Sequence, residues 1–204
     1  MRIDADTYTT KRQREVMGKK KRLKKQNEVF IALNQDGTLI VPHDRGSNVK
    51  QMKRIAENCG LTGKEKKRFF QAVRSLRYKN KWESGTCYEH SQAFKVWSDI
   101  GHEISYREGF CLHFPQKPHH GWLEWNGKIL DLILGYCFEP NPEAYIPFYE
   151  GNPEEGTGLI TEMWKETGMM ARLIDYCPSL RNNKKERKRF YALEKKVMDM
   201  PYIR

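Results

Sequence analysis

The chain has 204 residues and a mass of 24.2 kDa, which allows one compact domain with appendages and is too short for two full-sized domains. No apolar run approaches the ~20 residues of a membrane span, and the first residues lack the apolar segment of a secretory signal. The five cysteines are odd in number, widely spaced and without a CxxC pair, which argues against a disulfide framework. We therefore expect a soluble, cytoplasmic protein with reduced thiols and no membrane partner.

Charge is arranged in blocks along the chain. Residues 1–80 and 179–204 are strongly basic, with net charges of +13 and +6, whereas residues 81–178 have a net charge of −8. Blocks this lopsided indicate that the ends and the middle have different roles. The basic ends could hold nucleic acid or an acidic protein, or they could simply be solvated surfaces.

The predicted elements begin with residues 1–27, a basic arm that is nearly free of large apolar side chains. Residues 28–80 follow as a hairpin, with its turn at Asp36-Gly37, and two basic helices, of which the first ends at Gly60. Neither helix carries evident catalytic chemistry.

The next predicted helix has a well-marked start. Thr86 and Glu89 form a capping box that places Cys87 in the first turn, and Gly101 ends the element. Alternation of apolar and polar residues then predicts a strand over residues 102–114.

A hairpin is predicted over residues 119–134. Its Asn126-Gly127 pair is the strongest short signal for a two-residue type I′ turn, and this turn fixes the register. His120 and Asp131 then become diagonal neighbours on one face, at roughly 7–8 Å between backbones. The expected cross-strand pairs are Trp125 with Lys128, Leu123 with Leu130, Trp122 with Asp131, and His120 with Ile133.

The last part of the chain is predicted to be mostly loop and helix. Residues 135–156 contain four prolines and are expected to be rich in loops. A helix over residues 159–176 and a basic terminal helix within residues 179–204 complete the elements.

Cys87, His120 and Asp131 together suggest nucleophilic catalysis. A thiol in the first turn of a helix lies in the positive field of the helix dipole, which favours the thiolate. Catalysis needs such a thiol, a His to move its proton and a third group to orient the His. Taken singly, each residue is more simply a buried thiol, a surface His or a lone polar residue in a hairpin. Their agreement favours the catalytic interpretation.

Two alternatives remain open at this hairpin. His119 is a rival base, because a one-residue slip in register would exchange it with His120. Cys111, His113, His119 and His120 could instead bind zinc, although their spacing is not a familiar zinc pattern.

The segments "SGTCYEHSQAF", "GHEISYREGF" and "HHGWLEWNGKILDL" resemble, in their order, the transglutaminase-like branch of the papain-like cysteine enzymes. The resemblance covers residues 82–150 and extends to uncharacterised phage and bacterial proteins with a similar series of segments. It implies an α+β fold in which a Cys-bearing helix packs on a small antiparallel sheet. It also implies that residues 81–178 are the catalytic core, with Cys87 as nucleophile, His120 as base and Asp131 as orienting carboxylate.

The resemblance leaves the oxyanion site open, since no Gln upstream of Cys87 matches the family's second donor. Asn80 and Trp82 are the candidates to replace it, and Trp122 is expected to shield the triad. The implied activity is acyl transfer on a protein or peptide substrate, without cofactor or metal: peptide, isopeptide or amide hydrolysis, deamidation or cross-linking. The alternative is a basic nucleic-acid-associated protein on an inactive version of this fold.

Overall fold

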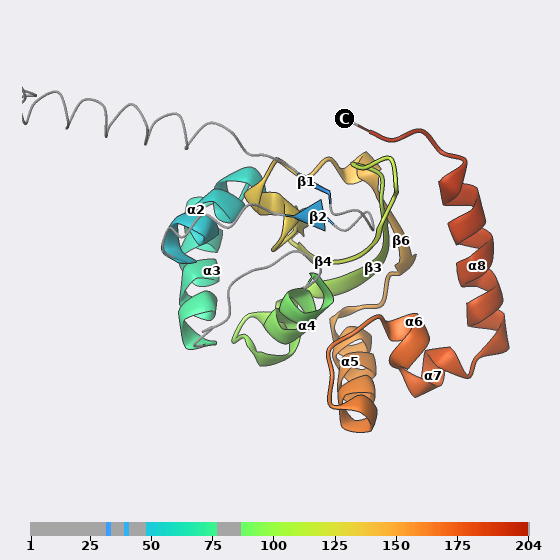
Figure 1. Ribbon diagram of the computed structural model, residues 1–204. Coiled ribbons are helices and arrows are strands. Elements are labelled where there is room, and N and C mark those ends of the chain that lie inside the picture. The colour runs from blue at the N-terminus through green and yellow to red at the C-terminus, as the bar shows by residue number, and fades with distance from the viewer. Residues whose placement is uncertain (1–31, 34–38, 41–47, 77–86, 204) are drawn as a thin grey trace, which may run out of the picture.

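A computed structural model describes residues 32–33, 39–40, 48–76 and 87–203 (Figure 1). The fold is mixed α+β, with helices arranged around a small four-stranded antiparallel sheet. This confirms the expected fold class at that level of detail. The predicted arm at residues 1–27 and the turn at Asp36-Gly37 lie outside the described residues.

The sheet has the strand order β5-β4-β3-β6, and each neighbouring pair is antiparallel. The central pair is β3 and β4, and the two outer strands cover its edges. The bounds are Ser105–Cys111 for β3, His119–Trp125 for β4, Lys128–Leu130 for β5 and Tyr145–Tyr149 for β6.

Strand β6 lies within residues 135–156, which the sequence predicts to be rich in loops, and it was not itself predicted. Pro147 lies in the middle of β6, and a proline argues against a strand because it cannot donate a backbone hydrogen bond. Since β6 is an edge strand paired only with β3, one missing donor is tolerated there. The backbones approach closely at Gly109, where a Cβ atom would lie 2.1 Å from the carbonyl oxygen of Ile146.

The predicted turn of the β4–β5 hairpin is confirmed. Asn126 and Gly127 both have positive φ, at 52° and 72°, as a type I′ turn requires. The pairs Trp125–Lys128 and Leu123–Leu130 also form as predicted.

The hairpin ladder ends at Leu130, which corrects the rest of the predicted register. The pairs Trp122–Asp131 and His120–Ile133 do not form, because the chain leaves the strand at Asp131. The Asp131 carboxylate accepts hydrogen bonds from the backbone N–H groups of Ile133 and Leu134 at 2.9 and 2.8 Å. These bonds begin a turn that runs into the short helix η2, Leu134–Tyr136.

The helices and the first hairpin before the sheet agree with the prediction where they are described. The short strands β1, Ala32–Leu33, and β2, Leu39–Ile40, pair antiparallel. Helix α2 spans Asn48–Asn58 and helix α3 spans Gly63–Ser75. Gly60, with φ of 63°, lies in the turn between the two helices.

Helix α4, Cys87–Trp97, begins at the predicted cysteine but ends before Gly101, which belongs to the short helix η1, Gly101–Glu103. It packs closely on β4, where the Ser91 hydroxyl donates to the carbonyl oxygen of Gly121 at 3.1 Å. A Cβ atom at Gly121 would lie 3.0 Å from the ring of Tyr88, which belongs to α4, and 2.9 Å from the Tyr106 hydroxyl oxygen. The glycine therefore lets α4 approach the sheet and brings its first turn to the end of β4.

The single helix predicted over residues 159–176 is two helices. Helix α5, Pro153–Thr167, starts earlier because Asn152 caps it, and it ends where Gly168 adopts a φ of 69°. The short helix η3, Pro142–Ala144, precedes β6. The helices that follow α5 are α6, Leu173–Tyr176, α7, Pro178–Arg181, and α8, Lys184–Met198. None of the described helices has the length and apolar character needed to cross a membrane.

Glu108 of β3 connects the sheet to α6 directly and to α4 through Tyr106. Its carboxylate is fully buried and accepts hydrogen bonds from the Tyr106 hydroxyl at 2.9 Å and from the backbone N–H of Leu173 at 3.0 and 3.1 Å. Gln92 of α4 donates in turn to the Tyr106 oxygen at 2.9 Å. Burial raises the pKa of Glu108 to about 7 despite these hydrogen bonds.

Glu108→Gln tests this buried carboxyl. Because its pKa is raised from 4.5 to about 7 on folding, Glu108 contributes stability at low pH that is lost as the pH rises toward 7. Between pH 5 and pH 8, the free energy of unfolding of the wild type should fall relative to the variant by about 2–3 kcal/mol in urea denaturation. Glu150→Gln, at an exposed acid, is the control and should not change the pH dependence. An equal difference at both pH values would contradict the assignment.

Candidate active site

The structure brings His120 and Asp131 into direct contact. The His120 Nε2 atom lies 2.6 Å from the Asp131 Oδ2 atom, and both side chains are buried. Asp131 follows β5 directly, and its departure from the ladder leaves its side chain within reach of the face of β4 that carries His120. The predicted contact between the two residues is therefore confirmed, although the cross-strand pairs expected around it are not.

Asp131 is held in place by four hydrogen bonds. Its Oδ1 atom accepts the two backbone N–H groups that begin η2. Its Oδ2 atom accepts from His120 and from the hydroxyl of Tyr145, which lies 2.9 Å away on β6. The backbone of the turn and the Tyr145 hydroxyl thus fix the carboxylate, and the carboxylate in turn orients the imidazole of His120.

Cys87 completes the cluster from the first turn of α4. It is the first residue of the helix, it is only 7% exposed, and its side chain hydrogen-bonds to that of His120. Because Asp131 occupies Nε2 of His120, the nitrogen left for the thiol is Nδ1. The three residues that the sequence singles out therefore meet in one buried cluster, in the order thiol, imidazole, carboxylate.

The electrostatics of the cluster favour a charged imidazole. Burial alone lowers the pKa of His120, but the charges of Asp131 and Cys87 and the hydrogen bonds to them outweigh it and raise the pKa well above its usual value. Burial likewise opposes ionisation of Asp131, yet the charge and hydrogen bonds of His120 and the N–H groups of Leu134 and Ile133 lower its pKa. His120 and Asp131 form a buried ion pair.

His119, the rival base, has a different environment. Its Nδ1 atom hydrogen-bonds to the Tyr88 hydroxyl, and its ring packs against Phe110 and Phe190 with centroids 5.0 and 5.2 Å apart. Burial, together with the positive charges of Arg172 and His120, lowers its pKa to about 3. His119 is therefore a neutral packing residue, and it is His120 that contacts the carboxylate.

Trp122 covers the His120 side of the cluster, in the position expected of a shielding residue. Its ring is stacked over His120 with centroids 6.3 Å apart and is edge-on to Tyr145 at 5.1 Å. The indole is 3% exposed, so it excludes water from this side of the imidazole. Glu124, on the same face, is instead paired with Arg107 at 2.8 Å and takes no part in the cluster.

The zinc alternative finds no support in the geometry. Cys111, His113, His119 and His120 all belong to the described residues, and within those residues no group of three or more His, Cys, Asp or Glu side chains could hold a metal ion. Asn80, Trp82 and Thr86 lie outside the described residues. Tyr145 is the residue that sequence reasoning missed, because β6 itself was not recognised.

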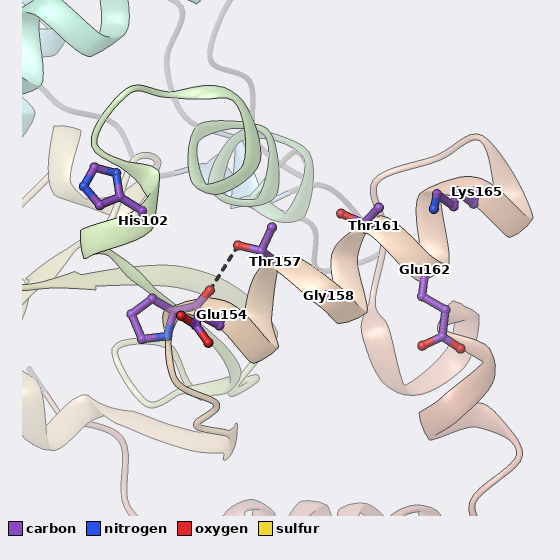
Figure 2. A pocket seen from close by; sticks show the side chains of 8 residues that line it. His102, Glu154, Thr157, Gly158, Thr161, Glu162 and Lys165 are labelled. Atoms are coloured by element: carbon purple, nitrogen blue, oxygen red, sulfur yellow. Dashed lines mark hydrogen bonds between the residues drawn. The ribbon is translucent and has the colours of Figure 1, made fainter.

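A groove of about 830 Å³ lies elsewhere, along the exposed side of α5 (Figure 2). Thr157, Thr161 and Lys165 of α5 line it, together with His102 of η1. The Thr157 hydroxyl donates a hydrogen bond to the carbonyl oxygen of Pro153 at 3.0 Å. None of the cluster residues lines this groove, and its side chains do not include a base oriented by a buried carboxylate.

Comparisons of the chain with protein-family models, with curated proteins and with solved structures gave no match. Membership in the transglutaminase-like branch therefore stays a prediction, as does a papain-like form of the core. The fold is described only as α+β with a small antiparallel sheet.

Asp131→Asn tests the ion pair. Without the carboxylate charge, the lowering effect of burial is less compensated, so the pKa of His120 should fall. The pKa can be followed by the ¹⁵N chemical shifts of the imidazole during a pH titration. Glu124→Gln, on the same face of the sheet, is the matched control and should leave the His120 titration unchanged. A wild-type His120 that is neutral at pH 7 would contradict the ion pair.

Proposed function

We propose that the protein is a cysteine-dependent acyl-transfer enzyme in which Cys87 is the nucleophile, His120 the base and Asp131 the orienting carboxylate. The observation that carries the proposal is the continuous hydrogen-bonded series from Cys87 through His120 to Asp131. A nucleophile, a base and an orienting group in hydrogen-bond contact are the recurring requirement of this chemistry. The resemblance of the three sequence segments to the transglutaminase-like branch supports the same roles.

The reaction balances with these three side chains alone. The thiol proton resides on His120, and the Cys87 sulfur attacks a carbonyl carbon to form a C–S bond. The C–N bond of the substrate then breaks, and the leaving amine takes the proton from His120. Water or an amine next attacks the thioester, His120 accepts its proton, and the C–S bond breaks to restore the thiolate. Water gives hydrolysis or deamidation, and an amine gives cross-linking.

A backbone N–H group at the start of α4 is suited to stabilise the tetrahedral intermediate. The backbone N–H of Cys87, at the first position of the helix, has no acceptor within the helix. Such a group is a suitable oxyanion donor, and the helix dipole adds a positive field at the same end. Asn80 and Trp82 stay candidates for a second donor or support.

The first test is selective alkylation. Burial raises the pKa of Cys59 to about 12 and that of Cys111, Cys137 and Cys177 to about 11, so these thiols are internal controls. At pH 7, iodoacetamide should modify Cys87 first, as mapped by peptide mass spectrometry. An ordinary thiol is only about 3% ionised at this pH, so His120→Ala should slow the reaction about tenfold or more.

The exposed His102 offers a matched control for this test, and His102→Ala should leave the alkylation rate unchanged. First modification of any other cysteine, or reaction of Cys87 no faster than in the denatured chain, would reject the activated nucleophile.

The second test measures acyl transfer itself with p-nitrophenyl acetate. The wild type should release one burst of nitrophenolate and carry an acetyl group on Cys87, whereas Cys87→Ser should fold normally and give no burst. Nitrophenolate leaves without a proton, but hydrolysis of the thioester needs a base. Asp131→Asn should therefore slow the hydrolysis phase more than the burst. Acetylation of lysines alone, with Cys87 unmodified, would refute acyl transfer at this site.

A further inference from the structure

We propose that helix α8 is a binding surface for single-stranded nucleic acid. The proposal does not depend on the chemistry of Cys87. It rests on a continuous line of charge, on an exposed aromatic ring within that line and on the way the other face of α8 is occupied.

The first observation is the arrangement of the cations. Residues at i, i+4, i+7 and i+11 share one face of a helix, and in α8 these positions are Lys184, Lys188, Tyr191 and Lys195. We call these four residues the α8 stripe, and all of them are exposed. Three further cations flank the stripe on the exposed surface of the helix: Lys185, Arg187 and Lys196.

The second observation is that the lysines of the stripe have no ion-pair partner among the described residues. Lys184 and Lys185 occupy the first turn of α8, where the helix dipole disfavours cations, and Lys184 and Lys188 form a like-charged pair. Within residues 48–76 and 87–203, no carboxylate pairs with Lys184, Lys188 or Lys195, whereas Arg189 pairs with Glu186 at 3.0 Å. A polyanion would relieve this repulsion.

The third observation selects the kind of polyanion. Tyr191 is 50% exposed in the middle of the stripe, and Arg187 donates to its hydroxyl at 3.1 Å. An exposed aromatic ring between cations offers a surface on which a base can stack while phosphates meet the lysines. The stripe spans about 17 Å along the helix axis from Lys184 to Lys195, so it is long enough to face more than one phosphate of a strand.

The opposite face of α8 argues against a membrane as the occupant. Phe190 and Val197 are buried, and the Phe190 ring packs against Phe148 of β6 and Phe110 of β3 with centroids 5.2 and 5.7 Å apart. A helix that lies in a bilayer surface inserts its apolar face, and that face is already covered here. Figure 1 shows α8 at the edge of the molecule, on the opposite side from α2 and α3.

The test is the salt dependence of binding of a fluorescein-labelled single-stranded 20-mer of deoxythymidine to the full chain, measured by anisotropy. Each phosphate contact contributes about 0.7 to the slope of log affinity against log salt, so the triple variant Lys184→Gln, Lys188→Gln, Lys195→Gln should lower the slope by about 2. Tyr191→Ala should weaken binding about tenfold with little change in slope, and Tyr191→Phe should retain it. Circular dichroism checks that each variant keeps its helices.

The matched control removes three exposed lysines from the far side of the molecule, as Lys50→Gln, Lys64→Gln, Lys67→Gln. An equal loss of affinity in both triple variants would show an effect of net charge alone and overturn the proposal. Absence of oligonucleotide binding at 50 mM salt would overturn it as well. So would binding of poly-glutamate or of phosphatidylserine vesicles that depends on the stripe lysines while oligonucleotide binding does not.

Discussion

The carboxylate of Asp131 is the group on which the arrangement of the cluster depends. It ends the β5 strand by accepting the N–H groups of Ile133 and Leu134, and it orients His120 through the same side chain. Burying a charge is costly unless hydrogen bonds and an opposite charge compensate for it, and Asp131 has both. A buried ion pair is weak evidence for stability, because an apolar pair of similar shape often serves stability better. A buried ion pair beside a thiol is the arrangement that the proposed acyl-transfer chemistry requires.

The sequence predicts the part of the cluster that local rules control. The Asn126-Gly127 turn sets the first pairs of the hairpin. The Thr-x-x-Glu pattern at residues 86–89 predicts a helix start at Cys87, where α4 begins. The register beyond Leu130 could not be predicted, because a side chain rather than the turn decides where the strand ends. Tyr145 was missed for another reason: its strand contains Pro147, and only the position of that strand at the sheet edge makes the proline acceptable.

Two neighbouring histidines show how burial and partners separate chemically identical residues. His119 and His120 are adjacent in β4 and therefore face opposite sides of the strand. His119 meets aromatic rings and a neutral hydroxyl, so desolvation keeps it uncharged. His120 meets a carboxylate and a thiol, whose charges overcome the same desolvation. Alternation along one strand thus gives one packing residue and one ionised residue, and no property of the two residues in isolation would distinguish them.

The cluster and the α8 stripe place opposite demands on their surroundings. The proton transfer that we propose for His120 requires a buried, closely fixed geometry, in which interactions over a few ångströms are little screened. Attraction of a polyanion requires exposed charge, and salt screens its field beyond about 8 Å at physiological ionic strength. The fold meets both demands by packing Phe190 against the sheet, so that one face of α8 joins the core while its lysines stay in water.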